Sequence, residues 1–194
     1  MYKIAPVLIL VILSACNSPD NANVQEAALR PSKNSDTFNQ KIQVLMQDYY
    51  KLTEAFVNWD STALPSAASA LSNSLNNLPL PVKTDSASAM SYLVGAKTDL
   101  NAIGNDDLNI TTRRHALNSL TDHVYGFLNI ARYDRRKLYL QRCPMAFNDK
   151  DTAVWLSQSD SIRNPYLGLH HPRYKSGMLE CGETKEVLNY TGTK

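Results

Sequence analysis

The chain has 194 residues, enough for one domain with a sizeable core and short for two. Lysine and arginine number 20 against 18 aspartates and glutamates, and this near balance gives no support for nucleic-acid binding. With 43% hydrophobic and 20% charged residues, the composition is that of an ordinary soluble globular protein.

The first residues have the pattern of a lipoprotein signal. Lys3 precedes the apolar run 4–13, which is too short to span a bilayer, and Leu-Ser-Ala-Cys at 13–16 matches the bacterial lipobox. We therefore expect a signal peptide over 1–15 and lipid on Cys16. Asn17 after the cysteine favours the outer membrane. We expect the protein to lie on the periplasmic side of that membrane, with exposure at the cell surface as the alternative. The alternative is a plain signal peptide that contains a cysteine. Residues 16–36 are polar and predict a flexible tether.

Residues 37–133 are predicted to form an up-down four-helix bundle. Apolar residues recur at steps of three and four in four stretches, which is the period of an amphipathic helix. The expected starts are Asp36, then Asp60 or Ser61, then Asp85, and finally about Leu108. The residues expected to point inward are Phe38, Ile42, Leu45, Tyr49, Leu52, Phe56, Leu64, Ala68, Leu71, Leu75, Leu78, Ala89, Leu93, Ala96, Leu100, Ile103, Leu117, Leu120, Val124, Phe127 or Leu128, and Ala131.

Residues 134–194 differ in character from the helical stretches. The segments 138–142 and 153–156 are short and β-like, and the turns between them carry Asn, Asp, Pro and Gly. Such a segment cannot fold alone. We expect it to be irregular, with short β-like stretches, and to pack across the bundle with Trp155 and Tyr166 as anchors. The predicted fold class is thus mainly α with an appended C-terminal segment.

No motif of a known enzyme class is present. The sequence has no nucleotide-binding glycine loop, no serine-hydrolase elbow and no paired-histidine zinc motif. Neither a nucleophile with an evident base nor a pair of catalytic carboxylates can be assigned. We therefore expect a protein without enzymatic activity and without catalytic residues.

Two sulfur pairs are the strongest candidates for chemistry. If Cys16 carries lipid, Cys143 and Cys181 are the remaining cysteines, and each has a methionine nearby, Met145 and Met178. Thiolate and thioether groups favour Cu(I), so the four residues could form a soft-metal site. The alternative is a disulfide between the two cysteines, contributing about 4 kcal/mol by chain entropy. The spacing of the two cysteines and the expected export of the protein by themselves favour the disulfide, because exported cysteine pairs usually oxidise.

The histidines are weaker candidates. His123 lies one position from Val124 of the core stripe, so it could face the appended segment as a further metal ligand, and His115 lies two turns earlier. A surface or hydrogen-bonded histidine is the alternative at both positions. His170 and His171 could recruit Cu(II) or Zn(II) weakly, or could simply be an exposed loop tip.

Several motifs resemble an uncharacterised bacterial family, domain of unknown function number thirty-three forty-seven. They are Tyr-Leu-Gln-Arg-Cys-Pro-Met at 139–145, Trp-Leu-Ser at 155–157, Asn-Pro-Tyr-x-Gly at 164–168, Met-Leu-x-Cys-Gly at 178–182 and Asp-Tyr-Tyr-x-Leu at 48–52. The resemblance extends over about residues 38 to 187 and implies a four-helix bundle with an appended segment. Here residues 169–177 lengthen the link between the third and fourth of these motifs.

The resemblance also implies a function. Members of the family occur as lipoproteins or joined to periplasmic adaptor proteins of Cus-type heavy-metal efflux systems. We therefore expect an envelope lipoprotein that binds a soft metal ion, copper first, for sequestration or transfer to an efflux adaptor. The alternative is a structural or protein-interaction module that holds a disulfide and no metal.

Overall fold

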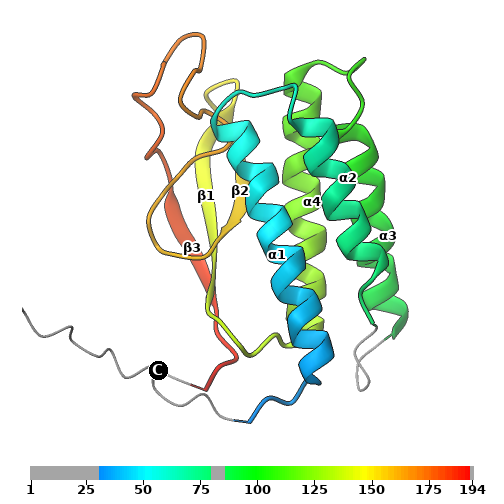
Figure 1. Cartoon of the computed structure of the whole chain (residues 1–194). Helices are drawn as coiled ribbons and strands as arrows, with labels where there is room; N and C mark the ends of the chain where they lie inside the picture. The colour runs from blue at the N-terminus through cyan, green and yellow to red at the C-terminus, as the bar shows by residue number, and fades with distance from the viewer. Residues whose placement is uncertain (1–30, 80–85, 193–194) are drawn as a thin grey trace, which may run out of the picture.

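The computed structural model describes residues 31–79 and 86–192, in which four helices are followed by a small sheet (Figure 1). The helices are α1 (Asp36–Val57), α2 (Leu64–Asn76), α3 (Ser86–Ile103) and α4 (Ile110–Ala131). The strands are β1 (Leu138–Phe147), β2 (Asp151–Ser157) and β3 (Glu183–Leu188). The predicted class, mainly helical with appended strands, is confirmed. The signal peptide, Cys16, most of the tether and Asp85 lie outside the described residues.

The predicted apolar stripes form the core of the bundle. All the inward residues predicted for the four helices are buried except Leu78, which is only partly buried and follows the end of α2. Both alternatives at 127 and 128 are buried. Burial of one face of each helix removes apolar area from water at roughly 25 cal/mol per Å², which is why the period of the sequence located these faces.

Helix starts were predicted less well than helix faces. Ser35, not Asp36, caps α1, since its side chain accepts a hydrogen bond from the amide of Phe38. Neither Asp60 nor Ser61 caps α2: the helix starts after Ala63, and Asp60 instead accepts bonds from the amides of Thr62 and Ala63 in the preceding turn. At α4 the cap is Asn109, which accepts from Thr112. Several polar residues near the start of each helix could serve as its N-cap, and tertiary packing decides which of them does.

The sheet is antiparallel, with strand order β2-β1-β3. The third strand was not predicted, because only Thr184 and Leu188 of its six residues are not exposed, which leaves a weak alternation. On β1 and β2, Gln141 pairs with Trp155 and Cys143 pairs with Ala153. These four residues therefore share one face of the sheet.

The outer edge of β2 is closed by side chains. The amide of Leu156 donates to the hydroxyl of Tyr49 on α1 (3.1 Å), and the amide of Val154 donates to Oδ1 of Asn118 on α4 (2.8 Å). The hydroxyl of Tyr166 donates to the carbonyl of Val154 (2.5 Å). An open edge would expose unpaired backbone groups, so these bonds fix the sheet against the bundle and protect the edge from pairing with another chain.

The segment 158–182 joins β2 to β3 and covers part of the sheet. In Figure 1 it loops across the strands, returns to the end of the bundle where α1 stops, and then enters β3. Nε2 of Gln141 holds it by donating to the carbonyls of residues 159, 160 and 161, each at 3.1 Å. Trp155 and Tyr166, the predicted anchors, are 2% and 1% exposed. The segment was predicted to pack across the helical bundle. In the structure it packs on the sheet as well.

Candidate functional site

The structure brings Cys143 and Cys181 together. Cys143 lies on β1 and is fully buried, whereas Cys181 lies just before β3 and is partly exposed. Their Sγ atoms are 3.5 Å apart, and both thiols are free. The contact joins residues 38 positions apart in sequence, so the two ends of the segment meet at the cysteines. A sulfur–sulfur bond is about 2.05 Å long, so a disulfide is not shown.

Gly182 permits this approach. Its φ is +148°, and a Cβ built there would lie 2.7 Å from the carbonyl oxygen of Arg142 and 2.9 Å from the ring of Trp155. Any side chain at this position would push the chain off β1 and carry Cys181 with it. The glycine of the Cys-Gly pair therefore sets the distance between the two sulfurs.

Asn164 holds the backbone of Cys181 from the other side. Nδ2 of Asn164 donates to the carbonyl of Cys181 at 2.7 Å, and the amide of Asn164 donates to the carbonyl of Leu179 at 2.8 Å. Oδ1 accepts from the amides of Tyr166 and Leu167, and the residue is fully buried. Sequence reasoning assigned no role to Asn164 or Gly182. Both residues do belong to the family motifs quoted above. Asparagine and glycine are favoured in tight turns, and this could have pointed to their structural role.

The two methionines are close to the cysteines in sequence. Met178 lies in a turn, whereas Met145 lies in strand β1. Met178 and Cys181 belong to one tight turn, in which the amide of Cys181 donates to the carbonyl of Met178 at 3.1 Å. Met145 lies where the β1–β2 register shifts between Cys143 and Phe147. Both methionines are partly buried against the core. They are therefore adjacent to the thiol pair without being fixed as ligands.

His123 does not lie with the thiols. Its Nδ1 is 2.6 Å from Oδ2 of Asp99 on α3, and its ring fills the space beside Gly95, where a Cβ would be 2.3 Å from Nε2. His115 instead stacks on Phe147 of β1, with ring centroids 3.8 Å apart. The two histidines thus face different neighbours. His123 is the hydrogen-bonded histidine of the alternative given above, and it does not face the appended segment. Eight residues exceed two turns of 3.6, so the two side chains diverge around the axis.

The loop histidines also lie in separate settings. His170 is exposed, whereas His171 is partly buried against Trp59, at 5.4 Å between ring centroids. Within residues 31–79 and 86–192, no group of three or more His, Cys, Asp and Glu side chains could hold a metal ion. A metal at Cys143 and Cys181 would therefore need thioether or external ligands to go beyond two-coordination.

Burial changes the chemistry of the partly exposed thiol. It raises the pKa of Cys181 to about 11, and the hydrogen bond with Cys143 adds to the increase. The thiolate is the form that binds metal and reacts with electrophiles, so at neutral pH Cys181 is held as a neutral thiol. The native state binds this proton more tightly than the unfolded chain does. The free energy of unfolding should therefore fall as pH rises from about 9 to about 11.

We expect native Cys181 to react with iodoacetamide about 100-fold more slowly at pH 8 than an ordinary thiol, because its thiolate fraction is smaller by that factor. The rate should continue to rise toward about pH 11. Peptide mass spectrometry of a Cys16→Ser variant measures it at Cys181, with the protein unfolded in guanidinium as the control. A native profile that levels off near pH 9, like the unfolded one, would contradict the raised pKa.

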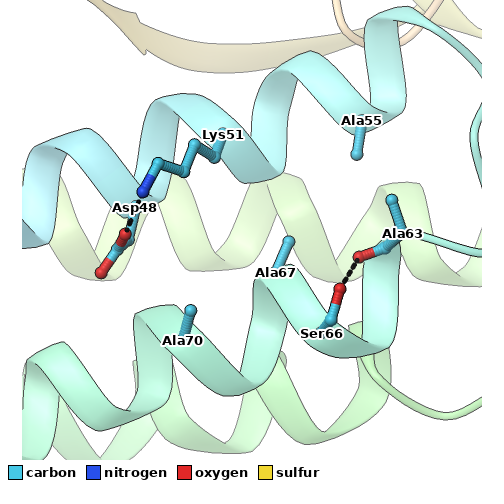
Figure 2. A pocket seen from close by; sticks show the side chains of 7 residues that line it. All are labelled: Asp48, Lys51, Ala55, Ala63, Ser66, Ala67 and Ala70. Atoms are coloured by element: carbon cyan, nitrogen blue, oxygen red, sulfur yellow. Dashed lines mark hydrogen bonds and ion pairs between the residues drawn. The ribbon is translucent and has the colours of Figure 1, made fainter.

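A shallow groove lies between α1 and α2 (Figure 2). Its floor and walls are mainly small side chains: Ala55, Ala63, Ser66, Ala67 and Ala70, with Asp48 and Lys51 at one end. Figure 2 shows Lys51 paired with Asp48 and Ser66 bonded to the carbonyl of Ala63. Small residues on the facing sides let the two helices approach closely. The polar groups already have partners, so the groove indicates no ligand.

The fold and the thiol pair define a class: a helical bundle whose appended sheet and loop bring two cysteines into contact. The family model described as Protein of unknown function (DUF3347) matches residues 45–135. The family predicted from sequence is therefore confirmed for the helical part of the chain, and the match ends before β1 and both cysteines. No curated protein and no solved structure matches the chain. Within the described part, no helix is long and apolar enough to cross a membrane.

Proposed function

We propose that this protein binds a soft metal ion, Cu(I) first, with Cys143 and Cys181 as thiolate ligands. The observation that supports this is the 3.5 Å contact between their Sγ atoms. In a tetrahedral site with metal–sulfur bonds of about 2.3 Å, two sulfurs lie about 3.8 Å apart. The Sγ atoms of Cys143 and Cys181 therefore need only a small displacement to coordinate one ion. Met145 and Met178 supply thioethers, which suit Cu(I) and not harder cations. The proposal includes no catalytic step.

Metal binding at this pair depends on pH. Because burial raises the pKa of Cys181 to about 11, the ion must displace at least one tightly held proton. The apparent affinity therefore increases with pH through the neutral range. This direction follows from the proton released, whichever soft metal is bound.

Titration of the full-length, reduced protein with Cu(I) against a competing chelator tests the proposal. One equivalent should bind, and Cys143→Ser should weaken binding by at least about 100-fold, since even residues behind the ligands change affinity by 10–100-fold. Cys16→Ser is the matched control, because it removes a cysteine outside the pair and should leave the affinity unchanged. Met178→Leu should cause a smaller loss. Equal affinities for Cys143→Ser and the unaltered protein would refute the site.

The alternative is a disulfide-stapled interaction module without metal. The same sulfur contact favours it, since a modest rotation would let the two thiols oxidise and would join β1 to the start of β3. The staple would contribute about 4 kcal/mol by chain entropy. Thiol counting on freshly purified, unreduced protein separates the two functions: two free thiols after export support the metal site, whereas none supports the staple.

We place the protein at the outer membrane on the strength of its sequence. The Leu-Ser-Ala-Cys motif at 13–16 predicts lipid on Cys16, and two or three acyl chains anchor stably because each buried CH₂ contributes about 0.8 kcal/mol. Transfer of the ion to a Cus-type efflux adaptor rests on the family resemblance. Incorporation of labelled palmitate in cells, lost in Cys16→Ser, tests the anchor.

A further inference from the structure

Arg114 is a buried arginine that forms no ion pair with the residues that the structure describes. It lies near the start of α4, is 4% exposed, and stacks on the indole of Trp59 with its Cζ 3.8 Å from the ring centroid. Its Nε and Nη2 atoms are buried, and neither has a hydrogen-bond partner in the described part of the chain. Burial lowers the pKa of this guanidinium to about 10, which still leaves it charged at neutral pH. A buried charge of this kind is costly unless something accepts its hydrogen bonds.

The two unpartnered nitrogens form one edge of the guanidinium. Arg163 uses the same pair on the surface, where Nε donates to Oε2 of Glu54 at 2.8 Å and Nη2 donates to Oε1 at 2.5 Å. This side-on fork matches two oxygens of a carboxylate or phosphate. Neighbouring Arg113 is better satisfied, since its Nε donates to the carbonyl of Ile103 and its Nη1 pairs with Asp106, which leaves its Nη2 as the one buried nitrogen without a partner in the described residues. Arg114 presents the same pair of donors, Nε and Nη2, but no oxygen of the described residues accepts from them.

The surroundings are also short of negative charge. His171 lies edge-on to Trp59, and its Nδ1 accepts from the amides of residues 173 and 174, so the proton of the neutral ring is on Nε2. Arg114 contributes to the lowered pKa of His171, after burial. The nearby carboxylate of Asp149 is already bound by Arg173 and Tyr174, each at 2.7 Å. Among the described residues, this carboxylate is therefore already occupied and forms no ion pair with Arg114.

We infer that the Nε and Nη2 edge of Arg114 binds a small oxyanion, a carboxylate or a phosphate group, with Trp59 and His171 beside it. The edge is closed in the structure, so the ion enters when residues 169–175 move away from α1. That segment consists of turns and one short antiparallel bridge between His171 and Lys175. It carries four exposed side chains: His170, Pro172, Arg173 and Lys175. At this end the amide of Leu169 holds it to the carbonyl of Val57 at 2.8 Å. The site is independent of the thiol pair and of the proposed metal.

Titration of the full-length protein with sodium phosphate and with sodium acetate, at ionic strength held constant with NaCl, tests this site. Tryptophan fluorescence reports on Trp59, and the midpoint of thermal unfolding gives a second readout. We expect a saturable fluorescence change and a higher midpoint with at least one of the two anions. Tighter binding of phosphate assigns the group as a phosphate, and tighter binding of acetate assigns it as a carboxylate.

Three variants connect the response to Arg114. Arg114→Lys keeps the charge but loses the fork, and should weaken binding at least 10-fold. His171→Ala, at a partly exposed position, should weaken it several-fold while leaving the fold intact. Arg163→Lys is the matched control and should bind as the unaltered protein does. A response no larger than that to NaCl, or one unchanged in both Arg114→Lys and His171→Ala, overturns the inference and leaves water as the partner of the buried donors.

Discussion

Replacing Asn164 with alanine is expected to destabilise the protein by about 3–5 kcal/mol, since three buried backbone groups lose their partner at about 1–3 kcal/mol each, with partial relaxation. These groups are the carbonyl of Cys181 and the amides of Tyr166 and Leu167. Urea denaturation followed by tryptophan fluorescence measures the change, because Trp155 is buried and its ring centroid lies 6.1 Å from that of Tyr166 in this turn. The turn that carries Cys181 should also loosen, so Cys143 should become reactive toward a bulky thiol reagent in the native state.

Asn77→Ala serves as the control for the Asn164 experiment. Asn77 is exposed at the end of α2, and its Nδ2 donates to the carbonyl of Asn73 at 2.8 Å. Loss of this exposed bond should cost about 0.5 kcal/mol, because water replaces the partner. If Asn164→Ala unfolds within about 1 kcal/mol of the unaltered protein, the Asn-Pro-Tyr turn does not hold the segment as argued.

Replacing Gly168 with alanine is expected to cost about 3 kcal/mol or more, the sum of left-handed backbone strain of about 1–2 kcal/mol and a backbone clash. Its φ is +58°, and a Cβ would lie 2.4 Å from the carbonyl oxygen of Val57. That carbonyl accepts the amide of Leu169 at 2.8 Å, so the clash opens the junction between the segment and α1. The denaturation midpoint in urea measures the loss, and near-ultraviolet dichroism should show a changed environment of Trp59.

Gly177→Ala is the matched control within the same segment. Its φ is not in the left-handed region, and the nearest atom to a Cβ there is the carbonyl oxygen of Tyr174 at 3.2 Å. This substitution should change the free energy of unfolding by less than about 1 kcal/mol, because a small shift of an exposed turn accommodates the methyl group. Equal effects at the two glycines would show that backbone conformation at 168 is not the cause.

The faces of the helices could be predicted because burial acts on a regular period. Leu117, Leu120 and Val124 recur at the spacing that puts them on one side of a helix, and the core formed where that spacing indicated. Trp155 and Tyr166 could be recognised as anchors because large aromatic side chains bury the most area. Helix caps were less predictable, since several polar residues near each start can bond the same free amides.

The orientation of polar side chains depended on neighbours far away in sequence. His123 is one residue from a core position in sequence. Its side chain nevertheless packs against α3, where it bonds to Asp99 and fills the space beside Gly95. β3 escaped prediction because Lys185, Glu186 and Val187 are exposed, so its strand conformation comes from pairing with β1 and not from its own alternation. The unpaired fork of Arg114 is likewise invisible in sequence, since an arginine in the second turn of a helix is ordinarily solvated.

By itself, the sequence determined the four helical faces, the change of character after the bundle, and which two cysteines remain once Cys16 is assigned to lipid. Each of these follows from local period, composition or order along the chain. Only the tertiary structure decided that the sulfurs of Cys143 and Cys181 lie 3.5 Å apart. That distance depends on Gly182 passing close over β1 and on Asn164 bonding the carbonyl of Cys181, contacts that exist only when the sheet and the segment are packed together.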